Sequence, residues 1–131
     1  IIDNIIIVKD NDGAAYLVQW DYNGIGDMQV GQGYQIKTTT DVSLEINGAF
    51  AKTELYPILL EIGWNMIGYL REDNQSVEVI FDDLVNQGVI KIVKDYEGNV
   101  YLPEWNFNGI GNLEPGNGYQ VKTFQEGVLQ Y

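Results

Sequence analysis

Two segments of the chain are copies of one another, and this duplication limits the possible folds more than any other feature. Residues 5–38 align with residues 90–123 without a gap, and 19 of the 34 aligned positions are identical. The most conspicuous shared stretch reads WDYNGIGDMQVGQGYQIKT in the first copy and WNFNGIGNLEPGNGYQVKT in the second. A chain that repeats itself at this level is built from like structural units.

The two copies differ in how much sequence accompanies them. Residues 49–89, which precede the second copy, have no counterpart ahead of Ile1. We therefore expect residues 1–48 to be the back half of a first repeat unit and residues 49–131 to be a complete second unit. Two organisations are open: one compact pseudo-symmetric domain cut from a longer repeat protein, and a deliberate one-and-a-half-unit fold with a shared core.

Most of the expected elements are short β-strands. Residues 5–9 and 90–94 are β-branched runs, and each is followed by an acidic turn ending in glycine, which predicts a hairpin. Tyrosine and aliphatic residues alternate with polar ones over residues 34–38 and 119–123, which predicts half-buried strands with the tyrosine facing inward. Further strands are expected over residues 42–46, closed by an Asn47–Gly48 turn, and over 56–62 and 63–69.

One amphipathic helix is expected over about residues 76–87. Ser76 is a suitable N-cap and Gly88 a suitable residue just beyond the C-terminus. The apolar residues between them recur at helical spacing and form a single stripe. We therefore predict a mainly β fold, α+β at most, with antiparallel sheets in a small barrel or sandwich and this helix covering one face.

Composition excludes several kinds of chemistry. The chain has no cysteine and no histidine, so it lacks the usual thiol nucleophile, the commonest general base and the commonest transition-metal ligands. Its formal net charge of −12 disfavours nucleic acid and anionic membrane surfaces as partners. No apolar run is long enough to span a bilayer. We expect no catalytic residues, no metal site, no cofactor, no nucleic-acid partner and no membrane insertion.

The aromatic residues of the duplicated stretch are the candidate ligand-binding residues, and two interpretations of them are open. Strand alternation would make Trp20 the last core residue of its strand. Exposed rings beside amide side chains would instead suit stacking against sugars. Trp64 is expected in the core, and the glycines at 24, 26, 31 and 33 are expected to adopt positive φ in two consecutive turns. The candidate set is Trp20, Tyr22, Asn23, Trp105, Phe107 and Asn108.

Two motifs carry a resemblance to known proteins. GWNMIGY at residues 63–69 and PGNGYQVK at residues 115–122 flank the predicted helix. This arrangement resembles the GWN-x-IGY and PG-x-GYQ(I/V)K repeat modules of secreted and cell-surface proteins, notably of Bacteroidetes, and of some phage or virion proteins. The resemblance covers residues 60–123, and VGQGYQIK at 30–37 extends it to the first copy. It implies an extracellular, β-rich accessory module without catalysis of its own.

These observations lead to two expectations about function. The first is a non-catalytic structural or adhesive repeat module of an extracellular surface or fibre protein, whose partners are neighbouring repeats of its parent protein. The alternative is a carbohydrate-binding module that uses the loop aromatics to hold glycans. Either would be located outside the cell, at a cell surface or at a virion surface.

Overall fold

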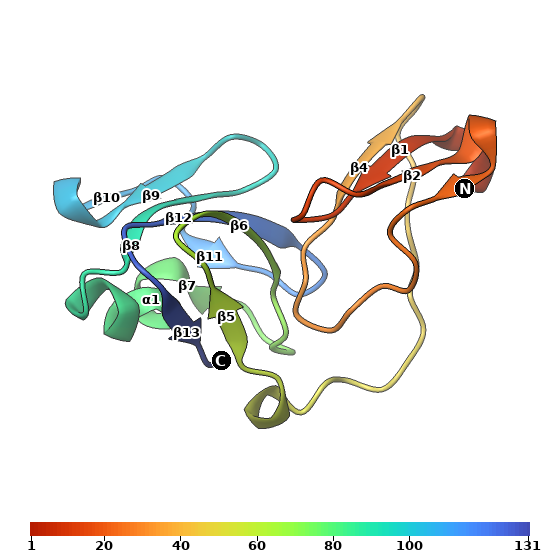
Figure 1. The fold of residues 1–131 in the computed structure, drawn as a ribbon. Coiled ribbons are helices and arrows are strands. Elements are labelled where there is room, and N and C mark those ends of the chain that lie inside the picture. The colour runs from red at the N-terminus through yellow and green to blue at the C-terminus, as the bar shows by residue number, and fades with distance from the viewer.

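The computed structural model describes residues 1–131 and is mainly β, with thirteen short strands and one α-helix. Each copy of the duplicated segment forms its own antiparallel sheet, and the two sheets lie on opposite sides of the molecule (Figure 1). Their strand orders are β3-β2-β1-β4 and β10-β9-β8-β12-β6, and β11-β7 and β13-β5 form two further pairs. The predicted mainly β fold class is confirmed, and both larger sheets are open.

Both copies close the hairpin between their first two strands in the same way. Asp10 Oδ1 accepts hydrogen bonds from the backbone N–H groups of Asp12 and Ala14, at 3.0 and 2.8 Å. Asp95 Oδ1 does the same for Glu97 and Asn99. The expected hairpins after residues 9 and 94 are therefore confirmed. The strands of the first sheet are β1 (Ile5–Lys9), β2 (Ala15–Leu17), β3 (Tyr22–Asn23) and β4 (Gln35–Thr38).

The second sheet is larger because it includes a strand from outside the duplicated segment. Its central strand β12 has β8 on one side and β6 on the other. The strands of this half are β5 (Ile58–Leu60), β6 (Gly63–Gly68), β7 (Gln75–Ser76), β8 (Ile90–Lys94), β9 (Val100–Leu102), β10 (Phe107–Asn108), β11 (Asn112–Leu113), β12 (Gly118–Thr123) and β13 (Gly127–Leu129). Short 3₁₀ turns span Ile2–Asn4, Val18–Trp20, Thr53–Leu55 and Pro103–Trp105.

The single helix, α1 (Val77–Asn86), agrees with the prediction in its position and in both of its ends. The Ser76 hydroxyl accepts a hydrogen bond from the N–H of Glu78 at 3.3 Å, and Gly88 has the positive φ of +73° that ends a helix. Its apolar stripe is buried against β8 and β13. No helix here has the length and apolar character needed to cross a membrane.

The hydrophobic core lies almost entirely in the second half of the chain. All fourteen residues of the buried cluster fall between Leu60 and Leu129. They come from α1 and from the facing sides of β6, β8, β9, β12 and their neighbours. Val8 is the one buried apolar side chain outside that range. The first sheet therefore has hardly any buried core of its own.

The first copy is attached to the second through the backbone. The Gly33 N–H donates to the Met66 carbonyl at 3.2 Å, and the Gly68 N–H donates to the Gly31 carbonyl at 2.9 Å. The N–H of Met66 also donates to Asn11 Oδ1 at 2.6 Å. Through these bonds the loop before β4 lies along the edge of β6 that β12 leaves free.

The expected strand over residues 42–46 is absent. These residues correspond to the segment around β13 in the second copy, which pairs with β5. The first copy has no counterpart of β5, so its residues 42–46 are exposed and have no strand partner. The Asn47–Gly48 hairpin turn is likewise absent. The sequence has the pattern of a strand, but the neighbour that would complete it is missing.

Two of the four glycines expected at positive φ do not adopt it. Gly26 and Gly31 have the predicted conformation, with φ of +76° and +87°. Gly24 and Gly33 do not. A Cβ on Gly33 would lie 2.7 Å from the Ile67 carbonyl oxygen, so the close approach of the backbone requires glycine at this position. A Cβ on Gly24 would lie 2.8 Å from Tyr22 Oη, the end of an exposed side chain that can move aside.

Buried tyrosines predict a loss of stability in alkali. Burial raises the pKa of Tyr69, Tyr101, Tyr119 and Tyr131 above the usual value. An unfolded chain releases these protons near pH 10, before the folded chain does, so the unfolded state is favoured as pH rises further. In urea denaturation we expect a constant free energy of unfolding from about pH 8 to 9 and a steady fall above about pH 10. A flat profile to about pH 11 would contradict this burial.

Candidate functional site

Each copy contains an exposed aromatic corner at the outer edge of its sheet. In the first copy β2 ends at Leu17, and the chain turns through a 3₁₀ turn that ends at Trp20. Asp21 then adopts a left-handed conformation with φ of +49°, and Tyr22 returns to pair with Leu17. We call residues 20–23 the first aromatic corner. Trp20 lies at its apex.

The second copy builds the same corner from a partly different sequence. In this copy the 3₁₀ turn begins at Pro103 and ends at Trp105. Asn106 has φ of +49°, as Asp21 has, and Phe107 returns to pair with Leu102. Residues 105–108 are the second aromatic corner. Pro103 marks the point where β9 stops and the corner begins.

Both tryptophans project into solvent. Trp20 is 72% exposed and Trp105 is 77% exposed. The expectation that Trp20 ends its strand as a core residue is therefore wrong. Strand alternation stops at Leu17, because the 3₁₀ turn rotates the chain before Trp20 is reached. The position of this turn could not be read from residue alternation alone.

The second aromatic residue of each corner lies over a glycine. The rings of Tyr22 and Phe107 are about half exposed. A Cβ on Gly24 would meet Tyr22 Oη and Cε1, and one on Gly109 would meet Phe107 Cε1 at 3.1 Å. Each of these rings therefore lies close to a glycine, whereas the tryptophan beside it is more exposed.

The asparagine of each corner fixes the turn that follows. Asn23 Oδ1 accepts hydrogen bonds from the N–H groups of Ile25 and Gly26, at 3.2 and 2.9 Å. Asn108 Oδ1 accepts from the N–H of Gly111 at 2.8 Å. The carbonyl end of both side chains is thus occupied within the protein. The Asn23 amide nitrogen also donates to the Gly26 carbonyl at 3.5 Å, which leaves its second N–H and the Asn108 amide nitrogen to meet a ligand.

The two corners are separate surfaces. The first lies at the β3 edge of its sheet and the second at the β10 edge of the other sheet. These edges face away from the contact between the copies, and β10 lies at the far end of the molecule from the first sheet (Figure 1). The corners therefore form two distant platforms of equal geometry.

Backbone strain recurs at the same position in both corners. Asp21 and Asn106 are the only residues other than glycine with positive φ in the chain. A non-glycine residue held in this conformation costs about 1–3 kcal/mol and occurs more often at functional sites than elsewhere. The shared strain shows that the corner geometry is maintained in both copies although two of its four residues, at 21 and 22, differ.

A third exposed tryptophan lies on the opposite side of the second sheet from α1. Trp64 was expected in the core, but its ring is half exposed. Lys94 Nζ and Lys122 Nζ lie 5.8 and 5.5 Å from the ring centre, which is cation–π geometry. Its neighbour Asn65 is buried instead, because only one face of β6 is covered by the helix.

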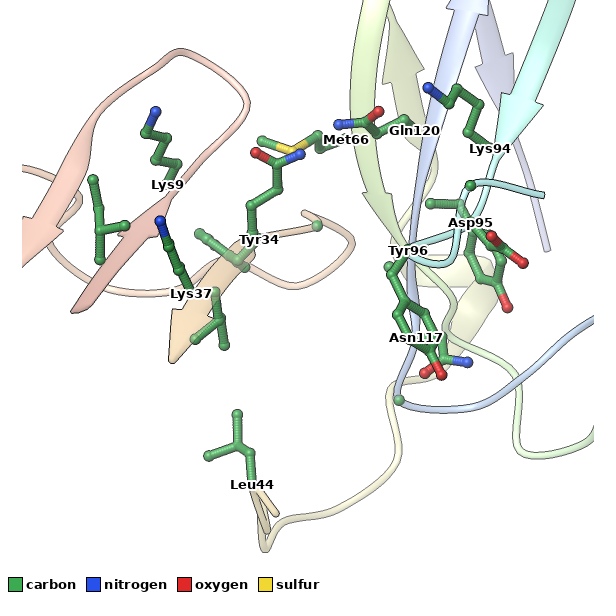
Figure 2. Close-up of a pocket in the computed structure, with 18 of the residues that line it drawn as sticks. Lys9, Tyr34, Lys37, Leu44, Met66, Lys94, Asp95, Tyr96, Asn117 and Gln120 are labelled. Carbon is green, nitrogen blue, oxygen red and sulfur yellow. The ribbon is translucent and has the colours of Figure 1, made fainter. Parts of the chain in front are cut away.

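An open cleft of about 890 Å³ separates the two copies. Lys9, Tyr34 and Lys37 line it from the first sheet, and Lys94 and Gln120 line it from the second (Figure 2). The structure has a single ion pair, between Arg71 and Asp73, so these three lysines are not neutralised by a carboxylate in contact. The cleft is thus locally basic in a strongly acidic chain.

The sequence signals for the cleft were present but scattered. Lys9 and Lys37 have their counterparts in Lys94 and Lys122, so the duplication itself places lysines on equivalent strands. What the sequence could not show is that the lysine-bearing faces of both sheets border one space. No group of three or more acidic side chains is arranged to hold a metal ion.

Comparison with known proteins found no match. No protein-family model, no curated protein and no solved structure is significantly similar to this chain.

Proposed function

We propose that this chain is a non-catalytic adhesive module of an extracellular surface or fibre protein, and that its two aromatic corners contact the target. One observation carries the proposal: the same strained turn exposes a tryptophan in both copies. Tryptophan is enriched among residues that dominate binding energy at interfaces. A chain under no demand for binding has little reason to expose two such rings at equivalent positions.

The distance between the corners favours attachment to an extended or repetitive target. Two weak contacts on one chain raise the effective affinity by about 10²–10⁴ when the target offers both sites at once. A cell surface, a polymer or a fibre offers sites in that way. The geometry thus suits adhesion better than the capture of one small molecule.

Carbohydrate is the second candidate, as the specific ligand of the corners. Trp20 and Trp105 present flat, solvent-facing rings, and an amide nitrogen from Asn23 or Asn108 lies within the same corner. Such rings stack against the apolar face of a sugar, while amides bond to its hydroxyl groups. A neutral glycan would also meet no repulsion from the net charge of −12.

The absence of catalysis in this proposal rests on side-chain chemistry. No cysteine or histidine is present to act as a nucleophile or base.

Replacing the corner tryptophans should abolish attachment without unfolding the protein. Because both rings are exposed, Trp20→Ala and Trp105→Ala should each change the free energy of unfolding by less than about 0.5 kcal/mol. An interface tryptophan typically contributes about 2 kcal/mol, so each single variant should bind about 30-fold more weakly. The double variant should show no binding on a glycan array or on an immobilised target surface.

Tyr96→Ala is the matched control for these variants. Tyr96 is as exposed as the two tryptophans, but it occurs in one copy only, where the first copy has Asn11. Its replacement should leave attachment unchanged. If the double tryptophan variant binds as well as the parent chain, the corners are not the contact surface and the proposal fails.

A further inference from the structure

The two copies differ in what covers one face of the sheet. In the second copy, the face that carries Val93 and Val121 packs against α1, and β12 has β6 as its outer neighbour. In the first copy the equivalent strand β4 is an edge strand, and no helix lies over the equivalent face. The first sheet therefore resembles the second sheet but lacks an outer strand like β6 and a covering helix like α1.

The uncovered face keeps apolar residues at positions that form the core of the other copy. Ile36 is 41% exposed, whereas its counterpart Val121 is fully buried at 0%. Met28 is 55% exposed, whereas its counterpart Leu113 is also at 0%. Apolar side chains gathered on an open surface mark a site of interaction. Here the second copy shows directly what kind of element buries them.

The backbone of the uncovered face already has the conformation of the covered one. The N–H of Gln29 donates to Tyr34 Oη at 2.8 Å, just as the N–H of Glu114 donates to Tyr119 Oη at 2.9 Å. Gly26 and Gly111 share φ values of +76° and +78°. Docking onto a surface that is already formed avoids the cost of ordering it.

A hollow marks the place that the helix occupies in the other copy. It has a volume of about 190 Å³, and its lining residues are Val8, Tyr16, Asn23, Ile25, Gly26 and Met28. In the second copy the counterpart of Gly26 is Gly111, whose carbonyl accepts the N–H of Val77, the first residue of α1, at 3.0 Å. The Gly26 carbonyl meets only the Asn23 amide nitrogen, at 3.5 Å. The hollow therefore has both an apolar lining and an acceptor for a helix N-terminus.

We infer that the first sheet is an acceptor for a strand–helix segment of the same type as residues 58–89. The strand of this segment would pair with β4, as β6 pairs with β12. Its helix would place an apolar stripe like that of α1 in the hollow and its first N–H on the Gly26 carbonyl. Trp20 and Trp105 lie outside this acceptor surface, and Asn23 is the one residue of the first aromatic corner that lines it.

A fused chain tests the inference. An added copy of residues 49–89 replaces residues 1–4 directly before Ile5, which reproduces the spacing that residues 49–89 have to Ile90. Amide hydrogen exchange at Ile36 and Thr38 should slow by about 100-fold or more, as expected for a segment present well above its dissociation constant. Methyl NMR should show contacts between Ile36 or Met28 and the added copy of Phe81.

Matched variants make the result specific to this face. Ile36→Glu in the first sheet should remove the added protection, because it places a charge in the covered face. Gln35 directly precedes Ile36 and lies on the opposite face of β4, so Gln35→Glu should leave the protection in place. Phe81→Asp in the added segment alone should return exchange at Ile36 to the rate of the unfused chain.

Two results would overturn the inference. The first is an unchanged exchange rate at Ile36 and Thr38 in the fused chain while the second copy stays folded. The second is protection of β4 in the unfused chain that grows with protein concentration, which would make a second copy of this chain the occupant. Loss of adhesion in the tryptophan variants affects neither outcome, so the two proposals stand or fall separately.

Discussion

Replacing Phe81 with alanine should lower the free energy of unfolding by about 3–5 kcal/mol, the usual cost of removing a buried phenylalanine. Phe81 is completely buried in the core cluster that α1 forms with the second sheet. A helix of ten residues is not stable alone and depends on this packing. Urea denaturation followed by circular dichroism measures the loss.

Val79→Ala is the control on the same helix. Val79 is exposed, so its replacement should change the free energy of unfolding by less than about 0.5 kcal/mol. A loss of less than about 1 kcal/mol for Phe81→Ala would mean that α1 does not pack as described. It would also remove the basis for comparing the covered face with the uncovered one.

Replacing Asn65 with leucine should cost about 2 kcal/mol or more, although leucine has a similar size and is apolar. Asn65 is buried, and its Oδ1 accepts the N–H of Glu61 at 2.9 Å. Its Nδ2 donates to the carbonyls of Glu61 at 2.9 Å and Gly63 at 3.2 Å. Leucine leaves the Glu61 N–H without a partner, and a buried polar group in that state costs about 1–3 kcal/mol.

Asn74→Leu provides the comparison for Asn65→Leu. Asn74 is an exposed loop residue, so we expect a change of less than about 0.5 kcal/mol. Equal stability of the Asn65→Leu variant and the parent chain would show that the carboxamide does not hold the turn between β5 and β6. The same result would leave the asparagine of the GWN motif without a structural explanation.

The features predicted correctly depend on signals close together in the sequence. The ends of α1 were predicted from Ser76 and Gly88, and the hairpins from an acidic residue and a glycine three positions apart. Such signals act through bonds within a few residues, for example from the Asp10 carboxylate to the Ala14 N–H. They form in the same way whatever else the chain contacts.

The features predicted wrongly depend on neighbours that a local pattern does not specify. Residues 42–46 alternate as a strand does, but they need a partner strand that the first copy lacks. Trp64 and Asn65 sit on opposite faces of β6, and only the position of α1 decides which face is buried. Trp20 follows the alternation of β2 until a 3₁₀ turn ends the strand before it.

The duplication was visible in the sequence, but its consequence was not. Identical residues at 19 positions predict two like units. They do not show that one unit buries its sheet face and the other leaves it open. Ile36 and Val121 are both β-branched aliphatic residues, and their different burial follows only from the missing strand and helix of the first copy.

The accessibility of the two corner tryptophans, free and attached, tests the proposed adhesion most directly. Chains that keep only Trp20 or only Trp105, with the other tryptophans replaced by phenylalanine, report each indole separately by acrylamide quenching of fluorescence. We predict strong quenching of both indoles in the free protein and protection of both once the protein is attached to its target surface. Weak quenching in the free protein, or no protection of either indole on attachment, would contradict the account.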